Sequence, residues 1–84
     1  MSGAPSVLAE IEVSDGSGVA GQTIHDLLRG CRTIVVLGLQ KGNGELQAGP
    51  PGTALLEPGD RVILMGEEQE LERIRPAARQ TPSP

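Results

Sequence analysis

The residues whose spacing most suggests chemistry are three glycines in the segment GSGVAG, residues 16–21. Their Gly-x-Gly-x-x-Gly spacing matches the loop that binds the pyrophosphate of a dinucleotide between a strand and a helix. That fold also needs a second strand ending in an acidic residue about 20 residues further on. The next expected strand ends in LGLQKGNG, which has no acid at that place. We therefore predict a flexible loop leading into a helix rather than a nucleotide site of the dehydrogenase kind.

The only histidine and the only cysteine, His25 and Cys31, are the other candidates for chemistry. One chain with these two residues cannot supply the four ligands of a structural zinc site. We expect His25 to point to solvent or to a subunit boundary, and Cys31 to be a small buried hydrophobe or a thiol near Arg29 and Arg32. The acidic run at residues 67–72 is typical of a solvated helix face, and no nucleophile has a base at recognisable spacing. We predict no metal site, no catalytic residue and no enzymatic activity.

The composition limits the partners that the chain can have. The 84 residues include no Phe, Tyr or Trp, and seven basic against eleven acidic residues give a formal net charge of −4. A negative surface repels phosphate backbones and anionic lipids, and without aromatic residues there is no platform on which bases can stack. No apolar run approaches the roughly 20 residues that span a bilayer. We therefore predict no nucleic-acid partner, no direct membrane insertion and, from the single cysteine and the lack of a signal peptide, a cytoplasmic location.

The first half of the chain predicts a strand, a helix and a strand. Apolar and polar residues alternate over residues 7–13, which predicts a strand with one buried side. Residues 22–30 carry apolar side chains at helical spacing and end in a glycine, which predicts a two-turn helix. Residues 33–39 are β-branched at first and apolar almost throughout, so we predict a central strand that is covered on both faces.

The second half predicts two more strands and a helix. Asn43-Gly44 tolerates the positive φ of a hairpin turn, which places a partner strand at residues 45–48. A Pro-Gly turn, in which Asp60 accepts backbone hydrogen bonds, starts a strand at residues 61–65. Acidic residues then open a short helix that covers the sheet with a narrow apolar stripe, and Pro76 closes this helix.

Together these elements predict an α+β fold. We expect a small mixed sheet of about four strands with two short helices, in the order β-α-β-β-β-α. The domain spans residues 7–75. The segments 1–6 and 76–84, rich in Pro, Ser and Ala, are expected to be disordered tails.

This arrangement resembles the C-terminal domain of regulators of potassium conductance, the TrkA-C family. The resemblance covers roughly Val7 to Ile74 and depends on GSGVAGQTIHDL and on the segment from TIVVLGLQKGNGELQ to VILMGEEQELERI. Its most telling part is the Gly59-Asp60 pair before the strand at residues 62–66. The family implies a cytoplasmic regulatory module, attached to a nucleotide-binding domain that gates a channel or transporter for potassium or another cation. It therefore implies a location peripheral to the inner membrane, through a transport partner.

The resemblance also implies a ligand, in some members a cyclic dinucleotide such as cyclic di-AMP held between two subunits. Carried onto this chain, the candidate binding residues are Val19, Gly21, Ile24 and Ile34. Backbone N–H groups at a helix start favour an anion, which is consistent with a phosphate-bearing ligand. The alternative is a purely structural loop, and no other cofactor is expected.

A chain this short buries a small core and gains stability by sharing a face with a second copy. We predict a homodimer whose interface contains Ile24, Leu27, Leu28, Val35 and Leu37. The alternative is that these residues fill the core of the monomer. The second functional hypothesis is a plain structural oligomerisation or interaction domain that has no small-molecule ligand.

Overall fold

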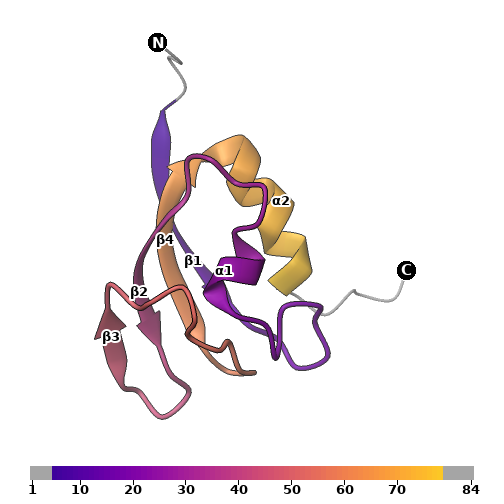
Figure 1. Ribbon diagram of the computed structural model, residues 1–84, viewed down its shortest axis with the longest axis vertical. Helices are drawn as coiled ribbons and strands as arrows, with labels where there is room; N and C mark the ends of the chain where they lie inside the picture. The colour runs from indigo at the N-terminus through magenta and orange to yellow at the C-terminus, as the bar shows by residue number, and fades with distance from the viewer. Residues whose placement is uncertain (1–4, 79–84) are drawn as a thin grey trace.

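The computed structural model describes residues 5–78 and confirms the predicted order of elements (Figure 1). The predicted tails lie outside the described residues except at their inner ends. The strands and helices are β1 (Ser6–Glu12), α1 (Ile24–Leu27), β2 (Val35–Gln40), β3 (Leu46–Ala48), β4 (Arg61–Glu67) and α2 (Glu68–Ala78).

The four strands form one sheet in the order β1-β4-β2-β3, and every neighbouring pair is antiparallel. The prediction of a mixed sheet is therefore wrong, although the α+β class is confirmed. The last strand in the sequence, β4, lies between β1 and β2. Strands β1 and β2 therefore run in the same direction without pairing with each other. The pairing of β1 with β4 joins residues far apart in the chain, so no local sequence signal indicates it.

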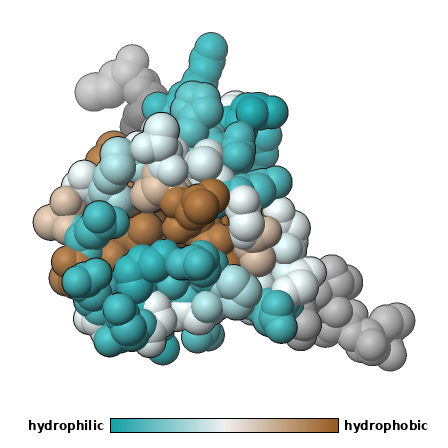
Figure 2. All heavy atoms as spheres, turned by 60° about the horizontal axis from the view of Figure 1, so that its bottom comes forward, coloured by the Kyte–Doolittle hydropathy of each residue, from teal (hydrophilic) through white to brown (hydrophobic). Residues whose placement is uncertain are grey.

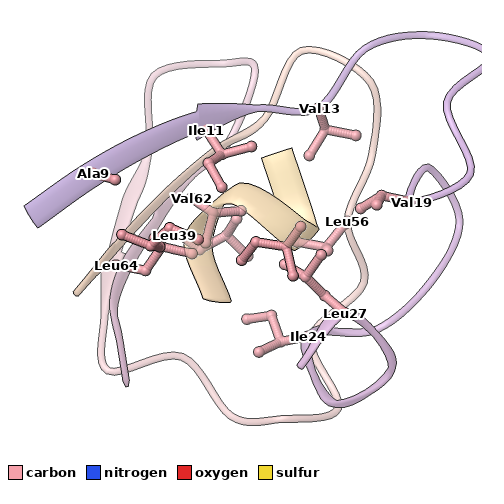
Figure 3. Packing of buried hydrophobic residues seen from close by; sticks show 12 residues of the cluster. Ala9, Ile11, Val13, Val19, Ile24, Leu27, Leu39, Leu56, Val62 and Leu64 are labelled. Atoms are coloured by element: carbon pink, nitrogen blue, oxygen red, sulfur yellow. The ribbon is translucent and has the colours of Figure 1, made fainter. Parts of the chain in front are cut away.

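The core lies between one face of the sheet and the two helices. Figure 3 shows side chains from the strands converging with those of α1 and of the connector between β3 and β4. Leu71 and Ile74 of α2 complete this cluster, which confirms the predicted apolar stripe of the covering helix. Burying a Val, Leu or Ile side chain of this set contributes roughly 1.5–3 kcal/mol, which makes the cluster the main favourable term in the stability of the domain. The buried hydrophobic residues are Ala9, Ile11, Val13, Val19, Ile24, Leu27, Leu39, Leu56, Val62, Leu64, Leu71 and Ile74.

The central strand β2 is covered by the chain on one face only. Val35 is 52% exposed and Leu37 is 41% exposed, so the prediction that both faces are buried is wrong for this chain. Both helices pack on the same side of the sheet, and nothing within residues 5–78 covers the other side. A register shift between Val36 and Gly38 makes Leu37 an extra residue relative to β4.

Helix α1 is a single turn, shorter than the two turns predicted. A capping box starts it: the Asp26 N–H donates to Thr23 Oγ1 (3.1 Å), and the Thr23 N–H donates to Asp26 Oδ2 (3.2 Å). The helix ends at Leu28, because Gly30 turns the chain with a φ of +83°. A helix this short depends on tertiary packing, and Ile24 and Leu27 provide it.

Helix α2 continues to Ala78, past Pro76, where it was expected to end. The proline stands in the last turn, so it removes a single hydrogen bond to a carbonyl one turn earlier. The helix therefore extends two residues further than a proline stop would allow.

The predicted hairpin is confirmed. The Gly44 N–H donates to the Lys41 carbonyl (2.9 Å), and the Lys41 N–H donates to the Glu45 carbonyl (2.7 Å). Of the Asn43-Gly44 pair only Gly44 has a positive φ (+93°), while Asn43 Oδ1 accepts from the Glu45 N–H (2.9 Å). The loop thus leads directly into the short edge strand β3.

Candidate functional site

A cavity of about 290 Å³ opens where the glycine loop, α1 and α2 meet. Its floor is apolar and is formed by Val19, Leu27 and Ile74, which are almost fully buried. Two arginines, Arg29 and Arg73, also line it, and Arg29 is ion-paired with Asp26 of the same lining (3.1 Å). Guanidinium groups are well suited to binding a phosphate or carboxylate. The lining residues are Gly18, Val19, Gln22, Asp26, Leu27, Arg29, Cys31, Arg73 and Ile74.

Of the four candidate ligand residues, Val19 alone lines this cavity, as part of its floor. Gly21 is exposed, has a φ of +89° and donates its N–H to the Leu56 carbonyl (2.8 Å). Ile24 is buried in the core, and Ile34 is half-buried beside Gly66. The structure therefore distributes these four residues over different surroundings, and their role in binding remains a prediction.

The amides at the start of α1 already have acceptors. The Ile24 N–H donates to the Ala54 carbonyl (3.0 Å) and the His25 N–H to the Gly52 carbonyl (2.8 Å). The Asp26 N–H donates to Thr23 Oγ1, the acceptor of the capping box. Hydrogen bonds from the backbone and side chain of Thr23 lower the pKa of the Asp26 carboxyl. These amides are therefore not free to bind an anion, and the Asp26 carboxylate at this end of the helix is paired with Arg29 (3.1 Å).

The five candidate dimer residues divide into two groups. Ile24 and Leu27 are buried in the monomer and Leu28 is half-buried, whereas Val35 and Leu37 are exposed on the uncovered side of the sheet. The helix residues therefore serve the core, which was the alternative reading for them.

We call the uncovered apolar side of the sheet the outer face. In β1, β4 and β2, Leu8 pairs with Met65 and Met65 pairs with Val35, so the three lie in one row. Leu46 and Ile63 lie over Gly38, where a Cβ would be 3.4 and 3.7 Å from their Cδ1 atoms. Figure 2, which brings the bottom of the view of Figure 1 forward, shows that hydrophobic side chains are also exposed among hydrophilic ones at this end of the molecule. The outer face consists of Leu8, Val35, Leu37, Leu46, Ile63 and Met65.

Two carboxylates have structural roles. Asp60, 1% exposed, accepts hydrogen bonds from the Glu57 N–H (2.9 Å), the Gly42 N–H (3.1 Å) and the ammonium of Lys41, which confirms its predicted role in the turn. Glu70 accepts hydrogen bonds from the segment that precedes β2, which the sequence did not predict. The two donor residues are 37 and 38 positions away from Glu70 in the chain, so no local sequence pattern indicates this contact.

The two other candidates for chemistry are His25 and Cys31. His25 is exposed, in agreement with the expectation that it points to solvent or to a subunit boundary, and Cys31 is half-buried. Burial, followed by the nearby Glu70 carboxylate, raises the pKa of the Cys31 thiol, so the group is held as a neutral thiol. Over the described range 5–78, no cluster of three or more metal-ligating side chains occurs, and no helix is long and apolar enough to cross a membrane.

Comparison with known protein families shows to which family the chain belongs. The model of the TrkA-C domain matches residues 8–79. The chain belongs to the TrkA-C domain family. The resemblance seen in the sequence is thereby confirmed, and this is a family of regulatory rather than catalytic domains. No curated protein shows significant sequence similarity to the chain.

Solved structures of similar fold include domains of a potassium transport protein, of BusR and of the GsuK channel. The RCK C domain of the potassium transport protein KtrA, in complex with cyclic di-AMP, is 28% identical, has a TM-score of 0.69, and the alignment covers 83% of this chain and 80% of that one. An RCK_C domain dimer of S. agalactiae BusR in complex with cyclic di-AMP is 25% identical, with a TM-score of 0.65, over 79% of this chain and 87% of that one. The GsuK channel bound to NAD, 22% identical with a TM-score of 0.66, shares the fold. There the alignment covers 88% of this chain but only 14% of the channel chain.

The prediction of no nucleic-acid partner is wrong. S. agalactiae BusR in complex with its busAB-promotor DNA has the same fold over 83% of this chain, with a TM-score of 0.69 and 24% identity. This chain spans 34% of that BusR chain. Charge and composition describe the surface of one domain, so they do not exclude a partner that is bound by the larger protein carrying it.

Proposed function

We propose that this TrkA-C domain is a ligand-sensing regulatory domain of a potassium channel or transporter, and that it works as a homodimer in the cytoplasm. The observation that carries the proposal is the similarity to the KtrA domain, which is 28% identical over most of both chains and is in complex with cyclic di-AMP. We take a cyclic dinucleotide as the ligand class.

The surface of the chain supports both parts of the proposal. Arg73 gives the cavity a guanidinium that suits the phosphates of a dinucleotide, while Arg29 of the same lining is paired with Asp26 (3.1 Å). The outer face, with Val35 and Leu37 exposed, offers an apolar surface to a second copy. The predicted ligand residues, together with the predicted limits of the domain at residues 7–75, remain part of this proposal.

A second candidate function has a specific observation behind it. The BusR domain that is 25% identical to this chain belongs to a protein that is also found in complex with promoter DNA. The same sensing domain joined to a DNA-binding part would make a ligand-responsive transcription regulator. The transport role leads because the KtrA domain has the higher identity, 28% against 25% and 24% for the BusR structures.

The experiment is thermal unfolding of the domain, followed by circular dichroism, with cyclic di-AMP, cyclic di-GMP, NAD and Mg²⁺. Ligand at a hundredfold excess over Kd stabilises the folded state by about 2.7 kcal/mol, which raises the Tm by several degrees. We expect cyclic di-AMP to give this rise, Arg73→Met to abolish it and Arg75→Met, which lies outside the cavity lining, to keep it. No rise with any compound would favour a plain oligomerisation domain without a ligand.

A further inference from the structure

A short segment of chain joins the cavity to the outer face. Cys31 lines the cavity, and Val35, four residues later, begins β2 and lies on the outer face. Whatever holds residues 32–34 therefore sets how these two surfaces lie relative to each other.

Glu70 holds the middle of this segment. Both of its carboxylate oxygens accept from the Arg32 N–H (3.0 and 2.9 Å), and Oε1 also accepts from the Thr33 N–H (2.8 Å) and from Thr33 Oγ1 (2.7 Å). Hydrogen bonds to a charged acceptor are the stronger kind. One side chain of α2 thus binds two consecutive amides and one hydroxyl.

The segment also lies directly against the junction of β4 and α2. A Cβ on Gly66 would be 2.5 Å from Ile34 Cδ1, 3.1 Å from Ile34 Cα and 3.2 Å from the Thr33 carbonyl oxygen, so only glycine permits this approach. On the same side, the Glu67 N–H donates to Thr33 Oγ1 (3.1 Å). Backbone packing thus holds the segment against β4, and the Glu70 carboxylate is its contact with α2.

The helix that carries Glu70 also forms a wall of the cavity. Arg73 and Ile74 stand three and four residues after Glu70, which is the spacing of neighbours on one face of a helix. A ligand that draws Arg73 toward itself acts on the same helical turn that holds residues 32 and 33.

We propose that Glu70 is a positioning residue that couples the cavity to the outer face by linking α2 to the segment before β2. This inference deepens the proposed function, because it explains how a bound anion would alter the dimer surface. A shift of α2 at Arg73 reaches Val35 through Glu70 and Thr33.

The test is a double-mutant cycle on the domain, read by NMR and without any ligand. Arg73→Met is made in the wild type and in Glu70→Gln, and the readouts are the Val35 methyl shifts and the hydrogen exchange of the Arg32 and Thr33 amides. We expect Glu70→Gln to speed exchange of these amides about tenfold, since it removes hydrogen bonds to a charged group. We expect Arg73→Met to move the Val35 methyl signals in the wild type but not in Glu70→Gln.

Matched controls separate positioning from a general loss of structure. Glu72→Gln, exposed on the same helix, should leave the exchange and the Val35 signals unchanged. Thr33→Ser keeps the hydroxyl and should preserve the coupling, while Thr33→Val should lose it. Equal Val35 shifts from Arg73→Met in both backgrounds, or none in either, would overturn the proposal. Because no ligand is involved, this result is independent of the cyclic di-AMP experiment.

Discussion

At the scale of single residues, carboxylates tie together segments that are far apart in the sequence. Asp60 joins the turn before β4 to the loop of the β2–β3 hairpin through Gly42 and Lys41. Lys41 also reaches Glu57 (3.0 Å), whose side chain is 65% exposed. Asp60 is buried and both of its carboxylate oxygens accept hydrogen bonds, so we expect it to contribute far more to stability than Glu57 does.

We predict that Asp60→Asn lowers the free energy of unfolding by about 2 kcal/mol, because a buried acceptor of two amides and an ammonium loses its charge. Glu57→Gln, which changes the exposed partner of the same lysine, should cost less than about 1 kcal/mol. Urea unfolding followed by circular dichroism measures both values. Equal losses in the two variants would show that Asp60 has no special role.

Glu70 should make stability depend on pH in a defined direction. Its hydrogen bonds from Thr33 and Arg32, with Arg73 nearby, lower the pKa of the carboxyl. A lowered pKa stabilises the fold above the unfolded value, and this stabilisation is lost as the pH falls through the folded value. We predict that the difference in unfolding free energy between wild type and Glu70→Gln is largest at pH 7 and shrinks between about pH 5 and pH 3. A difference that stays constant over this range would contradict the assignment.

At the scale of elements, local signals were sufficient for some parts of the fold and not for others. The hairpin at Gly44 and the turn at Asp60 are set by residues within a few positions, so the sequence predicted them. The position of β4 between β1 and β2 depends on pairing across some 50 residues, and the sequence does not show it. The cavity could not be predicted for the same reason, because Arg73 of α2 and Gly18 of the glycine loop line it together although they are far apart in the chain. Whether Val35 and Leu37 are buried or exposed could not be read from the sequence, because an exposed apolar strand and a buried strand have the same apolar pattern.

The junction of β4 and α2 depends on Gly66. We predict that Gly66→Ala destabilises the domain by about 1–3 kcal/mol, because the new methyl group overlaps Ile34 and backbone shifts must accommodate it. Gly18→Ala is the matched control, since a Cβ there meets nothing within 4 Å and the change should be within about 0.5 kcal/mol. Thermal unfolding of the two variants compares them directly, and a neutral Gly66→Ala would mean that the segment at Ile34 yields easily.

At the scale of the whole molecule, the domain has one covered face and one apolar face open to solvent. A row of Leu8, Met65 and Val35 across three strands is typical of a surface that a partner covers. We assign this surface to a second copy of the chain. The cavity and α2 lie on the opposite side of the sheet, so in this proposal the ligand binds within one subunit, whereas the resemblance implies binding between two.

We predict that Val35→Lys weakens the dimer at least about tenfold, because it places a charge within an apolar interface, while the fold remains intact. Leu55→Lys changes a side chain that is equally exposed, at 56%, but belongs to the connector rather than to the outer face. This control should dimerise like the wild type. Size-exclusion chromatography with light scattering gives the masses, and equal weakening by both variants would exclude the outer face as the specific interface.

Sedimentation velocity of the domain over a range of micromolar concentrations, with and without cyclic di-AMP, tests whether the chain is a ligand-sensing homodimer. We expect a monomer–dimer equilibrium that the ligand shifts toward the dimer, because binding to the dimer stabilises that state. A monomer at every concentration, unchanged by the ligand, would contradict the proposal of a ligand-sensing homodimer.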